Sequence, residues 1–143
     1  MSELLTVVLG IVLIAMVVVF LKVRQKDLVA AFMEKRRANS KLVCRADYVE
    51  GVEKIPVALS LTETALYYEN PDLEASFDLD RIDEIEYSQD LATGRSHDTN
   101  HEVLRLRSHG ATFEFLLEKA DCAKWMQALP PRTLDGRATA RAV

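Results

Sequence analysis

The first hydrophobic pattern in the chain is an uncharged run of eighteen residues, Leu4 to Leu21. At 1.5 Å per residue a helix of that length covers roughly 27 Å, which is close to the hydrocarbon thickness of a bilayer. The run therefore predicts an N-terminal transmembrane anchor over residues 1–21.

A cleaved signal peptide and a buried core helix are the alternatives for this run. A signal peptide has a basic segment before its apolar stretch and a small-x-small cleavage site after it. Here the run is preceded by Met1-Ser2-Glu3 and continues into Lys22 and Val23 with no such site. A core helix normally keeps a polar face, and this segment has only Thr6 and Gly10 to offer. The anchor is the favoured interpretation.

Residues 22–40 change to a helical, amphipathic pattern without Gly or Pro. Leu28, Val29, Phe32 and Met33 form an apolar stripe, which predicts a basic juxtamembrane helix continuing out of the membrane. The stripe has three alternative partners: the following domain, the lipid interface or a second copy of the chain. Packing on the domain is favoured, and a homodimer stays open.

From residue 41 the period changes to two, which predicts half-buried strands around Val57–Leu61, Leu66–Tyr68 and Ala75–Leu79. Ser108-His109-Gly110 separates two further alternating segments and predicts a hairpin. Its inward side chains are expected to be Leu104, Leu106, Phe113 and Phe115, with Arg105 and Arg107 outside, near Thr112 and Glu114.

One more helical pattern begins near Lys119. Its apolar stripe comprises Cys122, Trp125, Met126 and Leu129, and Pro130-Pro131 ends it. The predicted fold class is α+β: a transmembrane helix, then a partly open antiparallel barrel of about seven strands over residues 41–131, capped by this helix with Trp125 as its plug. Residues 132–143 are expected to be a disordered tail.

Charge gives the expected orientation. Residues 22–37 carry six basic and two acidic side chains, whereas only Glu3 precedes the apolar run. Because cytoplasmic flanks are rich in Lys and Arg, we expect a single-pass protein of the cell (inner) membrane with its N-terminus outside and its domain in the cytoplasm. The residues expected to contact lipid headgroups are Lys22, Arg24, Lys26, Lys35, Arg36 and Arg37.

The domain itself is acidic, with nine basic and eighteen acidic residues between Lys41 and Leu129. This excess argues against nucleic acid as a partner and against the domain lying flat on anionic lipid. Two cysteines, Cys44 and Cys122, are too few for a disulfide scaffold, so both are expected to be free thiols.

No catalytic motif, metal-ligand spacing or cofactor-binding loop is found in the sequence, so no enzyme activity, metal or cofactor is predicted. The acidic group Asp80, Asp83, Glu84 and Glu86 is expected to be a solvated face. His97 and His101 would share a metal only if helical, and their neighbours favour a loop. The stretch from Ser88 to Glu102 is instead a candidate interaction loop, with Arg95, His97, Asp98 and His101 as its candidate contacts.

The region 41–129 resembles the pleckstrin-homology-like superfold, in particular the GRAM and bacterial PH-like branch. The segments that carry the resemblance are 59–68, 77–86, Phe113-Glu-Phe115, and Trp125 with Leu129. The resemblance implies a non-catalytic module that binds lipids, peptides or proteins. The first hairpin departs from phosphoinositide-binding members, because Asp47, Glu50 and Glu53 stand there against Lys54 alone.

Two function classes follow as hypotheses. The leading one is a membrane-anchored adaptor that displays a protein-interaction surface, as an accessory subunit of a larger membrane complex. The alternative is a tethered sensor of a small molecule or lipid. A cyclic-dinucleotide-binding PilZ domain is disfavoured, because Arg36-Arg37 is not followed by the second motif of that family.

Overall fold

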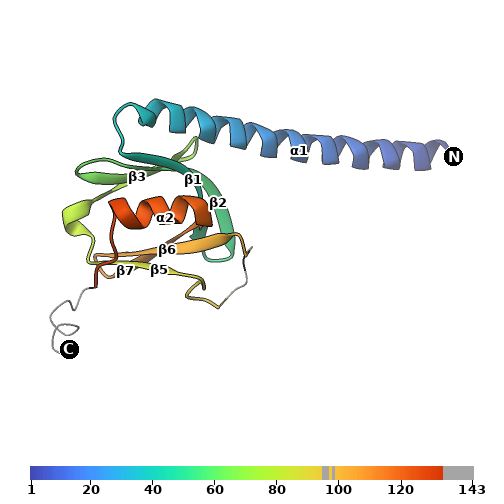
Figure 1. Ribbon diagram of the computed structural model, residues 1–143. Helices are drawn as coiled ribbons and strands as arrows, with labels where there is room; N and C mark the ends of the chain where they lie inside the picture. Colours follow the sequence, from blue (N-terminus) through green and yellow to red (C-terminus); the bar gives the residue numbers. More distant parts are fainter. Residues whose placement is uncertain (95–96, 98, 134–143) are drawn as a thin grey trace.

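The structure is a computed structural model that describes residues 1–94, 97 and 99–133, apart from the side chain of Gln25. Within these residues, two helices, seven strands and one short 3₁₀ turn follow one another (Figure 1). They are α1 (Ser2–Arg37), β1 (Leu42–Glu50), β2 (Glu53–Leu61), β3 (Ala65–Asn70), β4 (Leu73–Asp78), η1 (Leu79–Arg81), β5 (Glu84–Ser88), β6 (His101–Ser108), β7 (Ala111–Glu118) and α2 (Lys119–Ala128).

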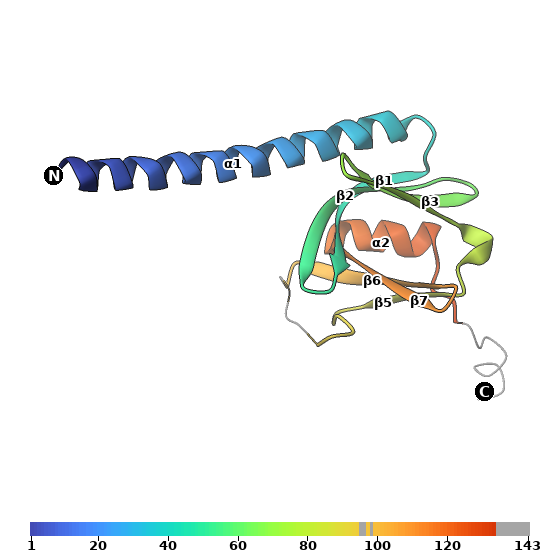
Figure 2. The same ribbon diagram turned by 180° about the vertical axis from the view of Figure 1, so that it is seen from behind.

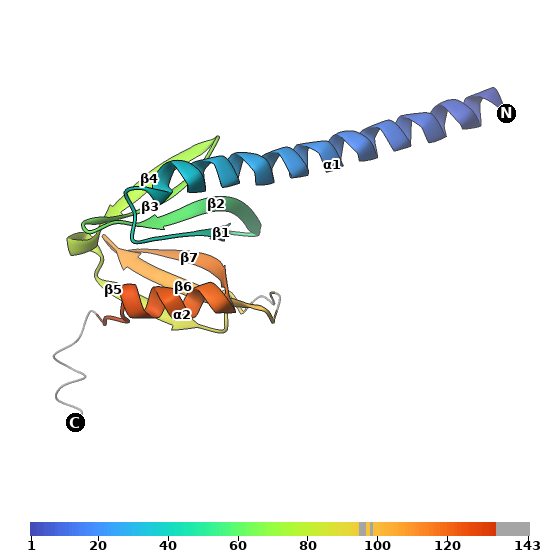
Figure 3. The same ribbon diagram turned by 45° about the horizontal axis from the view of Figure 1, so that its top comes forward.

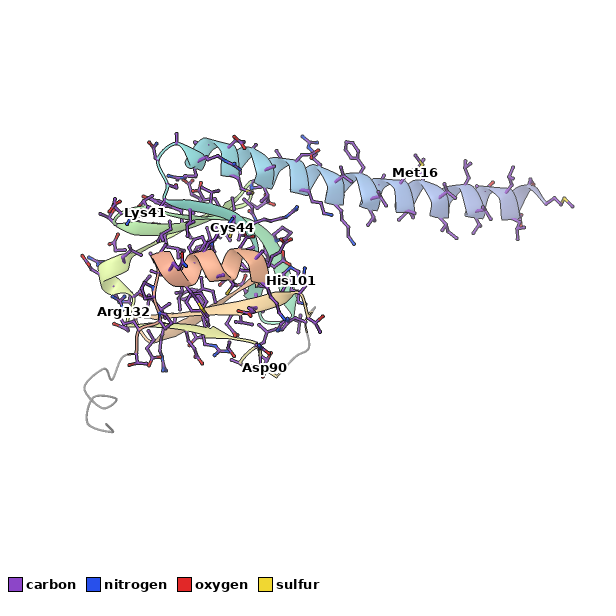
Figure 4. All side chains as sticks on the ribbon, viewed as in Figure 1. Met16, Lys41, Cys44, Asp90, His101 and Arg132 are labelled. Carbon is purple, nitrogen blue, oxygen red and sulfur yellow. The ribbon has the colours of Figure 1, made fainter. Side chains whose placement is uncertain are left out.

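Helix α1 contains both the predicted anchor and the predicted juxtamembrane helix in one uninterrupted rod. Its N-terminal half projects beyond the rest of the molecule, as the labelled side chain of Met16 illustrates (Figure 4). The apolar window in this half has none of its residues buried against the protein. By length and composition α1 is able to cross a membrane.

All strand pairs are antiparallel, and the seven strands form one open sheet in the order β4-β3-β2-β1-β7-β6-β5. The pairing between β1 and β7 covers only four residues of each strand, whereas β1 and β2 pair over nine. The sheet can therefore curl into two halves at this junction, with β1–β4 on one side and β5–β7 on the other (Figure 3). The α+β class and the seven antiparallel strands of the sequence prediction are confirmed.

Turn chemistry explains two of the sharp connections. His109 and Gly110 join β6 to β7, and both have positive φ, at 52° and 77°. This is the backbone that two-residue hairpins favour and that glycine adopts without steric cost. In the β3–β4 turn the Asp72 amide donates to the Asn70 side-chain oxygen at 2.8 Å. The strand predicted over Ala75–Leu79 corresponds to β4. Its predicted end is one residue too late, because Leu79 begins η1 instead.

The core lies between the sheet halves and α2. Trp125 is only 1% exposed and, with Leu129, belongs to the cluster that includes Leu104, Leu106 and Phe115. The predicted role of Trp125 as the plug of the partly open barrel is consistent with this packing. Five aromatic rings pack against one another with centroids 4.8–5.4 Å apart, contributed by Tyr48, Tyr68, Phe77, Phe113 and Phe115.

The last described residues cover part of a sheet edge. Arg132 pairs with Ile85 of β5 through two backbone hydrogen bonds, and its guanidinium donates to the carbonyls of Leu79 and Ile82. An unpaired strand edge invites non-specific pairing, and this contact shields it. The predicted disordered tail begins at this residue, and its residues 134–143 lie outside the described residues.

Helix α1 packs on the outer face of β1, β2 and β3, while α2 contacts β1, β6 and β7 (Figure 1). Val29 in the predicted apolar stripe is fully buried there, and Leu28, Phe32 and Met33 are half-buried. Three partners were considered for this apolar stripe, and in the structure the stripe packs on the domain.

A buried ion pair completes this docking. Arg36 Nε lies 2.6 Å from Glu69 Oε1, and the side chains are 25% and 1% exposed. The Arg36 guanidinium also lies 4.1 Å from the centroid of the Tyr67 ring, which adds a cation–π contact. Tyr67 and Glu69 alternate with Leu66 and Tyr68, so they face away from the core and toward α1. These contacts hold the domain at a defined angle to the rod.

Candidate interaction surfaces beside helix α1

One end of the domain faces the apolar half of α1. It contains the β1–β2, β3–β4 and β5–β6 connections and the junction of β7 with α2 (Figures 1 and 2). The side-chain view places Asp90 and His101 at this end and Lys41 and Arg132 at the other (Figure 4). If α1 crosses a bilayer, this end lies next to the membrane surface.

A groove of about 420 Å³ opens between α1 and the domain at this end. Two of its basic residues, Lys22 and Lys26, come from α1, and two more, Arg45 and Lys54, come from β1 and β2. His101 of β6 also lines it, and Asp47 and Glu118 are its carboxylates. Ala46, Pro56 and Leu116 complete its walls.

A second cavity of about 330 Å³ lies along α1 and shares Pro56 with the groove. Its wall on α1 comprises Leu21, Arg24, Leu28 and Val29, and the domain contributes Pro56, Asn70, Pro71 and Asp72. It is mainly apolar, with one basic and one acidic side chain. Both cavities therefore lie between the domain and the stalk, which is the part of α1 that follows the apolar run.

The six basic residues expected at lipid headgroups fall into two groups. Lys22, Arg24 and Lys26 lie in the first turns after the apolar run and line the two cavities. Lys35, Arg36 and Arg37 lie in the last turn of α1, where Arg36 binds Glu69 and Arg37 pairs with Glu34 at 3.2 Å. The second group is about three turns farther along the helix, so it is farther from the apolar run than the first.

Of the four candidate loop contacts, Arg95 and Asp98 lie outside the described residues. The ring of His97 forms a hydrogen bond with the carbonyl of Gln89. His101 is the first residue of β6, in register with Glu118, and it faces the basic groove. Within the described residues no group of three His, Cys, Asp or Glu side chains is arranged to hold a metal ion.

The start of the loop is tied to the sheet by Arg105. Its guanidinium donates to Glu86 at 2.8 Å, to Glu114 at 3.1 Å and to the carbonyl of Asp90 at 2.9 Å. Glu114 in turn accepts from the Ala92 amide. The predicted cross-strand role of Arg105 is thus confirmed, with Glu114 as its register partner.

The acidic group on the η1–β5 edge is exposed or half-exposed, as expected for a solvated face. Asp80 and Asp83 are exposed, Glu84 lies 3.6 Å from Arg107, and Glu86 binds Arg105. Asp80 and Asp83 thus present exposed carboxylates on this edge, beside the arginine-paired Glu84 and Glu86.

Both cysteines are free and buried, in agreement with the sequence prediction. Burial, with a smaller contribution from Asp121, raises the pKa of the Cys44 thiol far above its ordinary range. Burial also raises the pKa of Cys122 to about 12, helped by a hydrogen bond with Glu102. These thiols are therefore inert core residues at neutral pH.

The raised pKa of Cys44 predicts a loss of stability in mild alkali. Above pH ~8.5 the thiol of the unfolded chain ionises, whereas the folded thiol keeps its proton, so the unfolded state binds fewer protons. The free energy of unfolding should then fall with a slope that approaches about 1.4 kcal/mol per pH unit from this group as the pH passes 9. Urea titrations at pH 8 and pH 9.5 measure the slope. A Cys44→Ala variant should be less pH-dependent by that amount, and an unchanged slope would show the attribution to be wrong.

Sequence reasoning missed the roles of Arg45, Lys54 and Glu69. Strand alternation places all three on the outer side of the sheet. Nothing in the local sequence shows that the end of α1 packs against that side. Their significance depends on a contact between segments more than ten residues apart, and no local pattern encodes it.

No family model matches the chain, and no curated protein matches it. A crystal structure of the C-terminal domain of an unknown protein from Leishmania infantum is similar, with a TM-score of 0.49 and 15% identity, over 70% of this chain and 96% of that domain. Similarity at this level indicates no function.

Proposed function

We propose that this protein is a single-pass, membrane-anchored binding module without catalytic activity, which presents an acidic PH-like domain to a protein partner at the cytoplasmic face of the cell (inner) membrane. The observation that carries the proposal is the rigid joint between α1 and the domain. Val29 and the Arg36–Glu69 pair fix the domain to the rod, whereas simple attachment needs only a flexible linker.

The PH-like assignment is supported by the strand order and by the C-terminal helix that packs against the curled sheet. The proposed orientation rests on the basic residues after the apolar run. Tethering raises the concentration of the domain beside other membrane proteins. An accessory subunit of a larger membrane assembly fits this design.

The chemistry of the partner follows from charge. Cytoplasmic segments of membrane proteins are enriched in Lys and Arg. On the η1–β5 edge Asp80 and Asp83 are exposed, and neither forms an ion pair with another described residue. Opposite charges speed association and select partners. We therefore expect a basic cytoplasmic segment of another membrane protein to bind at this edge, at the end of the domain away from the apolar half of α1.

Co-purification of the full chain in mild detergent tests the proposal. The native chain should retain a membrane protein at low salt and lose it at high salt, because exposed charge pairs are screened. An Asp80→Asn/Asp83→Asn variant should lose the partner, while a control with the same charge change, Glu50→Gln/Glu53→Gln, should keep it. A monomer without partner in several detergents would contradict the proposal.

The tethered-sensor hypothesis is the second candidate, and the two cavities beside α1 favour it. A ligand that binds there should raise the melting temperature of the full chain in detergent by mass action.

A further inference from the structure

We infer that the groove between α1 and the domain binds the phosphate of an anionic glycerophospholipid. The inference rests on the proposal that α1 spans a membrane, but not on the protein partner. Four lysine and arginine side chains and His101 line the groove together with only two carboxylates. The domain as a whole has twice as many acidic as basic residues between Lys41 and Leu129. Positive charge is therefore concentrated where stalk and domain meet.

The depth of the groove matches the headgroup layer. Lys22 and Lys26 are one and five residues beyond Leu21, so along a helix they lie within the first ~8 Å past the apolar run. The polar layer on each side of a bilayer is on the order of 5–8 Å thick. Residues four apart also share one helical face, so both ammonium groups can reach the same phosphate.

The domain supplies the opposite wall of the groove. Arg45 and Lys54 come from neighbouring strands, and the pairing of Arg45 with Ala58 and of Lys54 with Val49 places them along the β1–β2 hairpin. Arginine and lysine both bind phosphate through charge-assisted hydrogen bonds. Leu116, Ala46 and Pro56 add apolar surface for the glycerol end of a lipid.

The surroundings favour this groove over the rest of the membrane-facing end. Glu50 and Glu53 flank the tip of the β1–β2 turn, and Asp72 lies in the β3–β4 turn. These carboxylates repel an anionic surface. A phosphate is thus attracted to the groove and repelled from the tips around it, which distinguishes a defined site from a diffuse basic patch.

The test is lipid retention by the purified full chain, measured by native mass spectrometry after exchange into mixed phosphatidylglycerol and phosphatidylcholine. The native chain should retain phosphatidylglycerol selectively. Arg45→Gln/Lys54→Gln should weaken this retention about thirtyfold, since each of the two basic contacts near an anionic surface contributes about 1 kcal/mol. Arg107→Gln/Lys124→Gln removes two exposed positive charges elsewhere on the domain, and retention should stay unchanged.

Three results would overturn the inference: equal retention of both lipids, unchanged retention in the Arg45/Lys54 variant, or equally strong loading of the lipid-free protein by glycerol 1-phosphate. The last result would assign the groove to a soluble phosphate compound. Failure of the membrane anchor would appear separately, as extraction of the chain by alkaline carbonate. Failure of the adaptor proposal would appear as the absence of any co-purifying protein, while lipid retention and membrane attachment stay intact.

Discussion

Replacing Trp125 by alanine should lower the free energy of unfolding by about 3–5 kcal/mol, the usual cost of truncating a buried tryptophan. Its ring is 1% exposed and belongs to the core cluster beneath α2. Truncation removes its packing within this cluster and leaves a cavity that the surrounding structure fills only in part.

Far-UV circular dichroism through a urea titration of the full chain in detergent measures this effect. Met126 provides the matched control, because it is the next residue of the same helix and is 40% exposed. Met126→Ala should change the free energy of unfolding by less than about 0.5 kcal/mol. Equal effects of the two substitutions would show that α2 does not cap the sheet through Trp125.

Replacing Arg36 by methionine should release α1 from the domain or destabilise the folded chain by about 3 kcal/mol, because it leaves Glu69 charged and buried without its partner. Glu69 is 1% exposed, so it cannot be hydrated unless the helix moves away. Limited trypsin digestion should then cleave more rapidly at Lys35 and Arg37. The fluorescence of Trp125 reports whether the domain itself stays folded.

Two further variants make this prediction specific. Arg36→Met/Glu69→Leu removes both charges and should recover most of the lost stability, since apolar residues often replace a buried ion pair at little cost. Glu34→Gln/Arg37→Gln removes a neighbouring ion pair whose side chains are 70% and 62% exposed, and it should leave the free energy of unfolding almost unchanged. Native protease resistance in Arg36→Met would show that this pair does not hold the joint.

The rigid joint connects these predictions to function. With the joint intact, the groove and the acidic edge keep fixed positions relative to the apolar rod. The Arg36→Met variant should therefore weaken selective phosphatidylglycerol retention as well, because Lys22 and Lys26 would separate from Arg45 and Lys54.

Local patterns predicted most elements well. The alternation around Leu104 and Phe113, the turn at His109-Gly110 and the stripe containing Trp125 each depend on neighbours within a few residues, so the sequence contains the relevant information. The strand ending at Leu79 was predicted too long, because the side-chain alternation continues into η1 while the backbone turns. The contacts proposed for Arg95 and Asp98 stay predictions.

The sequence by itself determined that the chain has an apolar helix long enough for a membrane, a basic segment after it, and an acidic domain of antiparallel strands with one closing helix. Only the tertiary structure decided which side of the sheet α1 covers, that Arg36 is bound to Glu69, and that Arg45 and Lys54 face the lysines of the stalk. The physical reason is range: hydrophobic periodicity and turn propensity act between near neighbours, whereas the groove and the joint form only when distant segments pack together.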